Sequence, residues 1–228
     1  MPLLAMQSIK HEDAVLDLKN YFEIKANGRP LYTGSRFETI AGGGDQNEPN
    51  RITAEDLIAV SMLSVYVPGQ AALGILGSYS EQLGKQLTRI PIDLRFEELT
   101  EGEFQKFLAE DSPADKLWNI LRQHGDRWGV GQTTASKILA RKRPHLIPIF
   151  DSVIAERVKI PGSGTQWTRW WSAFHEDPVQ GGELVEKLKS IREAAGQPHL
   201  SLLRVLDIVL WKSGRRLGIV PDATLDDA

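Results

Sequence analysis

Two helical segments joined by a short glycine-containing turn constrain this chain more than any other part of it. The first segment, residues 113–124, carries apolar positions at helical spacing and is expected to end near Gly125. The turn contains Gly129-Val130-Gly131, and the second segment, residues 132–140, follows at once. Two glycines allow a sharp turn, and the small side chains that open the second helix allow close approach of the two helices. The pattern therefore predicts a helical hairpin with a buried valine in its turn.

The rest of the chain also has the periodicity of helices. Apolar residues recur at helical spacing, capping residues such as Thr53 and Ser112 precede several segments, and no run alternates apolar and polar residues as a strand would. The predicted helices cover residues 11–24, 54–66, 71–77, 80–88, 100–108, 167–174, 179–195 and 199–213. Residues 25–37 are predicted to form a short hairpin or extended arm, and residues 42–44 begin an irregular loop. We therefore expect a mostly α fold with a short extended N-terminal arm.

The chain divides by composition into an N-terminal arm and loop (residues 1–50), a helical domain (residues 51–220) with the hairpin at residues 118–140, and an acidic tail (residues 221–228). The N-terminus is too weakly basic, and its apolar run too short, for a signal peptide. No apolar run approaches the ~20 residues that a membrane span requires. The sequence predicts a cytoplasmic monomer that does not engage a membrane.

The absence of cysteine limits the chemistry open to this chain. With no cysteine among its 228 residues it has no disulfide, thiol nucleophile, thiolate zinc site or cysteine-bound iron–sulfur cluster. Its net charge of −3 argues against bulk coating of nucleic acid, although it leaves room for a local basic face. His124, His145 and His175 lack metal-ligand spacing, so no metal site is expected.

The residues after the hairpin strengthen its interpretation. A basic run at residues 141–143 ends the second helix, and a proline-bounded connector, residues 144–148, leads to Asp151. This order of hairpin, proline-rich connector and aspartate resembles the helix-hairpin-helix/Gly-Pro-Asp DNA glycosylase superfamily. Residues 149–158 are similar in register to the aspartate segment of that family. The resemblance covers about 40 of the 228 residues.

The resemblance implies a helix-hairpin-helix DNA glycosylase-like bundle and a reaction centred on Asp151. In such an enzyme the carboxylate stabilises the oxocarbenium-like sugar that forms as the base leaves, and orients or deprotonates a water. Thr133 lies 18 residues before Asp151, at the position of the nucleophilic lysine of lyase-competent members, so Schiff-base chemistry is not expected. Trp128 stands where the family usually has proline. The expected enzyme is monofunctional and needs no cofactor, apart from a monovalent cation that the hairpin can hold.

The resemblance also assigns the hairpin to the DNA backbone. N–H groups at a helix N-terminus bind a phosphate oxygen without reading bases. The residues expected to contact the backbone are Trp128, Gly129, Val130, Gly131, Thr133, Thr134, Lys137, Arg141, Lys142 and Arg143. The expected partner is double-stranded DNA with a flipped base, either damaged or modified, including the hypermodified bases of phage DNA.

Aromatic side chains are the candidates for a base pocket or a wedge. They are Tyr32 and Phe37, which flank Arg36 in the N-terminal arm, and Trp167, Trp170 and Trp171. The three tryptophans lie at helical spacing, which is equally typical of core residues. We therefore expect most of them to be buried.

Two other interpretations stay open at the level of sequence. Asp151 precedes a helical segment and is a good N-cap, a role worth about 1 kcal/mol that involves no catalysis. The basic run at residues 141–143 is equally typical of a solvated helix end. The chain is then either a non-catalytic helix-hairpin-helix module that binds DNA or protein, or an unrelated helical protein whose turn and cap imitate the motif.

Overall fold

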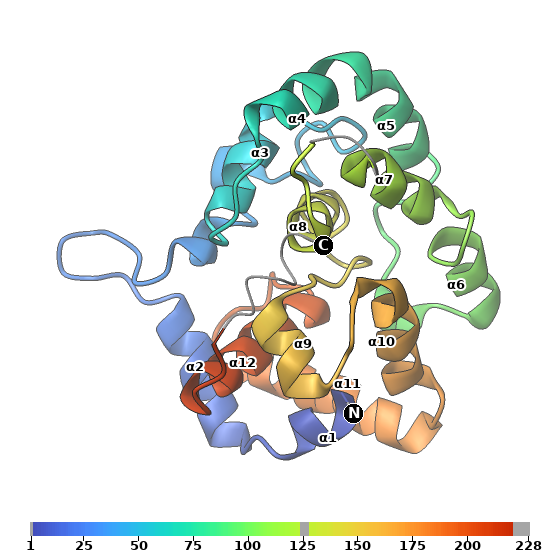
Figure 1. Ribbon diagram of the computed structural model, residues 1–228. Helices are drawn as coiled ribbons and strands as arrows, with labels where there is room; N and C mark the ends of the chain where they lie inside the picture. The colour runs from blue at the N-terminus through green and yellow to red at the C-terminus, as the bar shows by residue number, and fades with distance from the viewer. Residues whose placement is uncertain (1, 124–127, 221–228) are drawn as a thin grey trace. The chain divides into compact units, whose positions relative to one another are not determined.

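The structure is a computed structural model that describes residues 2–123 and 128–220 (Figure 1). Over these residues the chain forms α-helices and short turns, and no strand. The mostly α fold class expected from the sequence is confirmed. The short 3-10 turns are η1 (Thr33–Arg36), η2 (Ile40–Gly42), η4 (Phe96–Glu98) and η5 (Ser163–Thr165). The described residues divide into two compact units, one of residues 2–35 and 148–220, the other of residues 36–123 and 128–147.

The first unit combines the N-terminal helices with the C-terminal third of the chain. It contains α1 (Pro2–Gln7), α2 (His11–Tyr21), α9 (Ser152–Val158), α10 (Gln166–His175), α11 (Pro178–Ala194) and α12 (Leu202–Arg216). Helix α12 contacts α2, α9 and α11, and most of its residues are buried. Gly214 allows α9 to lie close, because a Cβ there would come within 2.7 Å of Cγ1 of Val153. Helix α12 is therefore the centre of this unit.

The chain after α2 forms the predicted arm. Ile24 and Pro30 make an isolated antiparallel bridge, and Gly28 turns the chain between them with a φ of 78°. Beyond this turn, Arg204 on α12 donates to the carbonyl oxygen of Gly34 at 2.9 Å. The arm is therefore a tight turn whose far end is anchored to α12.

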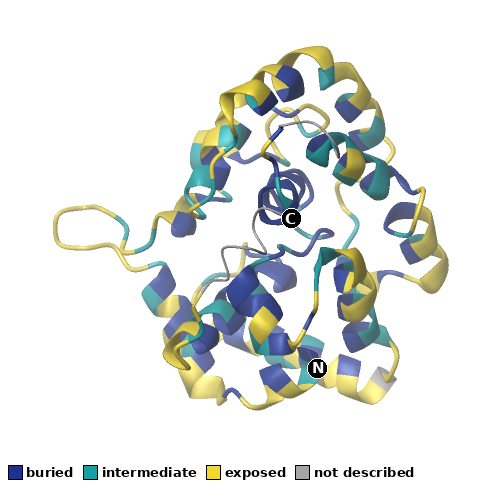
Figure 2. Ribbon diagram, in the orientation of Figure 1, coloured by how far each residue is buried: buried dark blue, intermediate teal, exposed yellow. Residues whose placement is uncertain are grey.

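The second unit is built on α8 (Gln132–Lys142), the second helix of the predicted hairpin. Its other helices are α3 (Ala54–Ser61), α4 (Gly69–Leu73), α5 (Ser80–Leu87), α6 (Glu101–Phe107) and α7 (Pro113–Arg122), with the π-helical turn η3 (Gly74–Ser78) between α4 and α5. Helix α8 contacts α3 and α7, and α5 packs on α7. Every residue of α8 is buried, as the dark blue ribbon in Figure 2 shows. This helix is therefore the core of the unit, although its sequence is largely polar.

Side-chain caps begin α3 and α7 where the sequence predicts them. The hydroxyl of Thr53 accepts from the N–H of Asp56, whose carboxylate accepts from the N–H of Thr53 at 3.0 Å, a capping box that starts α3. Ser112 accepts from the N–H of Asp115 at 3.1 Å to start α7, and Pro113 follows at the first helical position. Caps of this kind contribute about 1 kcal/mol each. The predicted starts of α3 and α7 are confirmed.

The structure also departs from the sequence-based predictions. Helix α3 ends at Ser61 rather than Tyr66, because Ser64 adopts a left-handed conformation (φ 63°) through which a helix does not continue. Helix α1 was not predicted, and the short helix expected over residues 71–77 is divided between α4 and the π-helical turn η3. The predicted boundary at residue 50 does not coincide with a unit boundary, since residues 2–35 belong with residues 148–220. The predicted acidic tail lies outside the described residues.

Candidate functional site

The described part of the hairpin turn begins at Trp128. Helix α7 ends at Arg122, and residues 124–127, which include its predicted end at His124, lie outside the described residues. Gly129 is exposed and has a φ of 69°, in the left-handed region that favours glycine. A Cβ at this position would lie 2.8 Å from Cγ of Pro68. Glycine is therefore required here both by the backbone conformation and by the available space.

Gly131 places the start of α8 directly after this turn. It is the N-cap of α8 in an extended conformation (φ −76°, ψ 179°), and it has no side chain that can accept from the first N–H groups of the helix. The N–H groups of a first helical turn lie at the positive end of the helix dipole and favour an anion. Gly129 is exposed and Gly131 half-buried, whereas Val130 is buried as predicted.

Trp128 is buried and serves the packing of the hairpin. Its indole N–H donates to the carbonyl oxygen of Leu121 at 2.5 Å, and 6% of the residue is exposed. The ring lies so close to Gly74 that a Cβ there would collide with it, and it meets Tyr79 edge to face, with 5.7 Å between ring centroids. The prediction that the Trp128 side chain contacts DNA is contradicted by this burial. The residue instead fastens the hairpin turn to α7 and to η3.

Polar side chains in the first half of α8 are buried as well. Thr133, Thr134 and Lys137 are each less than a tenth exposed. The Lys137 ammonium donates to the carbonyl oxygen of Leu63, just after α3, at 3.0 Å. The prediction of side-chain contacts between these residues and DNA is therefore wrong. The main chain of the turn from Gly129 to Gly131 is then the remaining candidate for a phosphate contact.

The basic run at the end of α8 forms a buried ion-pair network. Nε of Arg141 and Nζ of Lys142 lie 3.1 and 2.9 Å from the two carboxylate oxygens of Asp56, and the three side chains are at most 2% exposed. Arg141 also donates to the carbonyl oxygen of Ile40 at 2.6 Å, and Lys142 to that of Glu48 at 2.9 Å. Burial lowers the pKa of Lys142, and the hydrogen bond and charge of Asp56 oppose that shift. These two cations therefore hold the loop before α3 against α8.

Arg143 continues this network with main-chain acceptors. Its guanidinium donates to the carbonyl oxygens of Pro49 (2.8 Å), Leu87 (2.6 Å) and Ile90 (2.9 Å), and to Oδ1 of Asn50 (2.8 Å). Burial lowers the pKa of Arg143 to about 10. The prediction that the basic run contacts the DNA backbone is wrong for all three residues, because their donors are directed to the interior of the second unit.

Asp151 lies in the first unit, where it begins α9, and it is half-buried. Its Oδ1 accepts from the N–H of Val153 at 3.0 Å, so the residue is an N-cap, the structural role that the sequence offered for it. A carboxylate has about four acceptor sites, so the N–H of Val153 does not by itself fill it. The cap is therefore compatible with a chemical role for the same carboxylate.

Gln166 fixes the connector that leads to Asp151, and sequence reasoning missed it. This residue begins α10 and is 1% exposed, and its Nε2 donates to the carbonyl oxygen of Pro148 at 3.0 Å. Pro148 precedes Asp151 by three residues, so the bond restricts the path of the chain into α9. No sequence signal identifies it, because a side-chain bond to a distant carbonyl leaves no periodic pattern.

The aromatic candidate of the arm is part of a packed aromatic cluster. The ring of Tyr32 stacks on Tyr21, with 5.2 Å between centroids and 7° between planes, and meets Trp211 edge to face at 5.9 Å. Lys212 donates to the Tyr32 hydroxyl at 3.1 Å, and its Nζ lies 4.9 Å from the ring centroid. These contacts give Tyr32 a structural role in joining the arm to α12.

The other base-pocket candidates differ in accessibility. Phe37 and Trp170 are buried, which contradicts a direct contact of either with a base. Trp167 and Trp171 on α10 are half-buried, and Arg36 is exposed. We expected most of the three tryptophans at helical spacing to belong to the core, but only Trp170 is fully buried.

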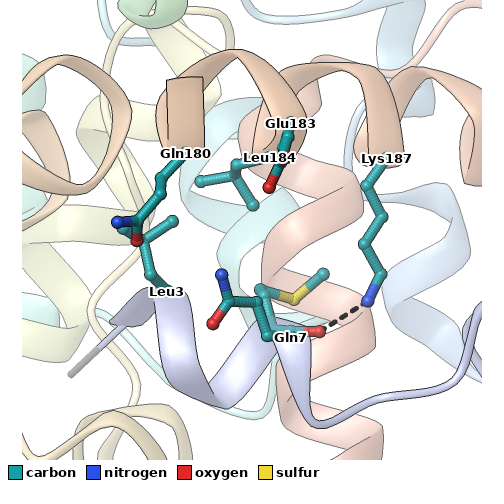
Figure 3. Close-up of a pocket in the computed structure, with 7 residues that line it drawn as sticks. Leu3, Gln7, Gln180, Glu183, Leu184 and Lys187 are labelled. Atoms are coloured by element: carbon teal, nitrogen blue, oxygen red, sulfur yellow. Dashed lines mark hydrogen bonds between the residues drawn. The ribbon is translucent and has the colours of Figure 1, made fainter. Parts of the chain in front are cut away.

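A small cavity lies between α1 and α11 in the first unit, and Figure 3 shows its lining. Its volume is about 90 Å³, and Leu3, Met6, Leu184 and Lys187 are among the residues around it. The Lys187 ammonium donates to the carbonyl oxygens of Met6 and Ile9 at 2.7 Å each, and burial lowers its pKa. Small-molecule pockets typically have volumes of roughly 300–1,000 Å³. The cavity is too small for a base pocket, and none of the predicted site residues lines it.

Comparison with known proteins matches the chain to a family. Residues 14–214 match the family of unknown function DUF6308. The chain belongs to this family. The matched region runs from α2 into α12 and so includes the hairpin, the buried network of α8 and Asp151. No curated protein and no solved structure matches the chain.

Two further observations concern the described part of this DUF6308 protein. Among residues 2–123 and 128–220, no helix combines the length and the apolar character that a membrane span needs. Within the same ranges, no group of three or more histidine and carboxylate side chains is placed to hold a metal ion. The candidates that remain are therefore the backbone of the hairpin turn, in the second unit, and separately the carboxylate of Asp151, in the first unit.

Proposed function

We propose that this DUF6308 protein is a monofunctional DNA glycosylase that acts on double-stranded DNA in the cytoplasm as a monomer. The observation that supports the proposal most is the turn at Gly129 to Gly131, where an exposed left-handed glycine leads straight into the N-terminus of α8. The order of this turn and Asp151 along the chain is the order in which the glycosylase superfamily carries its DNA-binding hairpin and its catalytic aspartate.

In this proposal the hairpin holds one phosphate of the duplex by main-chain N–H groups, with a monovalent cation as an optional bridge. Such donors bind phosphate without reading sequence. Because the basic run at residues 141–143 is buried, few cationic side chains contribute to binding at the hairpin itself. We therefore expect DNA binding with a shallow dependence on salt, in keeping with the net charge of −3.

Asp151 carries the chemistry. As the bond between C1′ and the base nitrogen breaks, the sugar gains positive charge, which a nearby carboxylate stabilises. A water then adds its oxygen to C1′, one of its protons passes to Asp151 or to solvent, and the leaving base takes up a proton. The products are a free base and an intact strand with an abasic site. Thr133 supplies no amine, so no Schiff base forms.

The substrate is proposed as a class. The class is that of damaged or modified bases, and a damaged base is easier to remove from the stack than a paired normal base, since its unpairing costs less. Hypermodified bases of phage DNA belong to the same class, and their excision would serve antiviral defence.

The N-cap geometry of Asp151 favours a second candidate, a helix-hairpin-helix module that binds DNA or protein without catalysis. The hydrogen bond that Asp151 accepts from the N–H of Val153 stabilises α9 by about 1 kcal/mol, and this role requires no catalysis. Under this alternative the hairpin binds its partner, and Asp151 only starts α9.

Base release by wild type and Asp151→Asn separates the two candidates. Asparagine caps helices about as well as aspartate, so the variant keeps α9 and loses only the charge. Asp177→Asn is the matched control, because Asp177 caps α11 by accepting from the N–H groups of Val179 and Gln180. Genomic and phage DNA are treated with each protein, and alkali-labile sites are counted. The glycosylase proposal is supported if wild type and Asp177→Asn produce alkali-labile sites and Asp151→Asn does not. Equal numbers of these sites with all three proteins would reject the proposal.

A further inference from the structure

The cavity between α1 and α11 brings a lysine amine to a small apolar space (Figure 3). Its surface is mostly apolar, with Leu3, Met6 and Leu184 among the residues around it, and Lys187 lines it as well. The volume is about 90 Å³. A single water needs at least roughly 10–15 Å³ of such space, and an apolar cavity of about 150 Å³ holds benzene. The cavity therefore suits a group of a few heavy atoms, smaller than an aromatic ring.

The hydrogen bonds of Lys187 match those of a neutral amine. Its Nζ donates to the carbonyl oxygens of Met6 and Ile9 at 2.7 Å each, at the end of α1. No carboxylate of the described residues forms an ion pair with this group. A neutral amine has two N–H groups and a lone pair, whereas an ammonium has three donors to place. The two carbonyl oxygens therefore satisfy every donor of the neutral form.

Few charges surround Lys187. Helix α1 has no charged side chain, and Glu183, four residues before Lys187, is the other charged residue that lines the cavity. Glu183 is exposed, where water and salt screen its charge. Burial has the larger effect and lowers the pKa of Lys187. A desolvated lysine beside an apolar cavity is a better nucleophile at neutral pH than a lysine in water.

We propose that Lys187 is a site of acylation by small activated acyl compounds, and that the transferred acyl group occupies the cavity between α1 and α11. The lone pair of Nζ attacks the acyl carbonyl carbon and forms a C–N bond. The bond from that carbon to the leaving group breaks, the leaving group keeps the bonding electrons, and the proton lost by Nζ passes to solvent. With acetyl phosphate the products are an acetamide on Lys187 and free phosphate. This inference is independent of the glycosylase proposal.

The test treats the full-length protein with acetyl phosphate and follows the acetylation rate of each lysine by mass spectrometry of peptides. Lys10 is the internal control, since it is an exposed lysine of the same unit. Lys187 should be acetylated several-fold faster than Lys10 near neutral pH. Its rate should also reach half of its maximum at a pH below the ~10.4 that is usual for lysine.

Two further measurements test the cavity itself. Leu3→Phe places a ring on the wall of the cavity and should slow the acetylation of Lys187 several-fold, with the rate at Lys10 unchanged. Leu4→Phe is the matched control, because Leu4 is the next residue of α1, is 61% exposed and does not line the cavity. Benzoyl phosphate tests wild type without a substitution. Its ring is too large for the cavity, so Lys187 should lose its advantage over Lys10 with this donor.

Three results would overturn the inference. Acetylation of Lys187 no faster than that of Lys10, with half of the maximal rate at the usual pH for lysine, would leave Lys187 as a cap of α1 alone. Equal acetylation of Lys187 in Leu3→Phe and Leu4→Phe would mean that the acyl group lies outside the cavity. The same conclusion would follow if benzoyl phosphate favoured Lys187 over Lys10 as strongly as acetyl phosphate does. None of these rates depends on DNA, so failure here leaves the glycosylase proposal untouched.

Discussion

Replacing Asp56 by asparagine is the sharpest perturbation of the buried network. The change removes one charge from a carboxylate that is 2% exposed and leaves Arg141 and Lys142 buried without a counter-ion. Breaking a buried ion pair by deleting one partner typically costs about 3–5 kcal/mol, because the remaining charge stays desolvated. At about 2–4 °C per kcal/mol for a chain of this size, the unfolding midpoint should fall by roughly 6–20 °C.

The assay is thermal and urea unfolding followed by circular dichroism. Glu103→Gln is the control, since Glu103 occupies the equivalent place in the capping box of α6 and is near the surface, away from buried cations. It should shift stability by no more than about 1 kcal/mol, because glutamine also completes a capping box. Equal effects of the two substitutions would refute the argument, and they would mean that Asp56 acts only as a cap.

The remaining predictions concern the hairpin. Gly129→Ala should weaken DNA binding. It should also lower the free energy of unfolding by more than the ~1 kcal/mol expected for an alanine in the left-handed region, because the added Cβ also overlaps Pro68. Gly28→Ala is the control, because it introduces the same backbone strain at a position with open space around it, and it should leave DNA binding in a gel shift unchanged. Equal DNA binding by the two variants would contradict a role for the hairpin turn. The logarithm of the binding constant should fall with the logarithm of salt concentration with a slope of magnitude below about 3, since the basic run is buried. A slope steeper than about −5 would point to a basic face that this account lacks.

The sequence predicted those features that depend on neighbouring residues. The capping box at Thr53, the cap at Ser112 and the left-handed turn at Gly129 follow from residue type and spacing within a few positions. The buried valine at position 130 also follows from the hairpin pattern. Local rules were sufficient there because the partners lie within one turn of chain.

The features that were mispredicted depend on distant acceptors. A basic run before a proline is equally typical of a solvated helix end, of a phosphate site and of a buried anchor. Arg143 is an anchor because the carbonyl oxygens of Leu87 and Ile90 lie around it, and main-chain acceptors leave no mark on the sequence. For the same reason α8 looks like a surface helix by composition and is buried along its whole length.

The division into units was also beyond local reasoning. Residues 2–35 join a unit completed only after residue 148, and no composition change marks either boundary. The hydrogen bond of Gln166 could not be predicted from local sequence either, since its acceptor, the carbonyl oxygen of Pro148, lies 18 positions earlier in the chain.

The most direct test of glycosylase activity is mass spectrometry of the products formed in water enriched in oxygen-18. Duplex or phage DNA is incubated with wild type, Asp151→Asn and Asp177→Asn, and both the released bases and the strands are analysed. The account predicts a free base without the label and an intact strand with an abasic site, formed by wild type and Asp177→Asn alone. The oxygen at C1′ is left out of the comparison, because the abasic aldehyde exchanges it with water. Absence of any released base, or label found in the base or the phosphate, would contradict it.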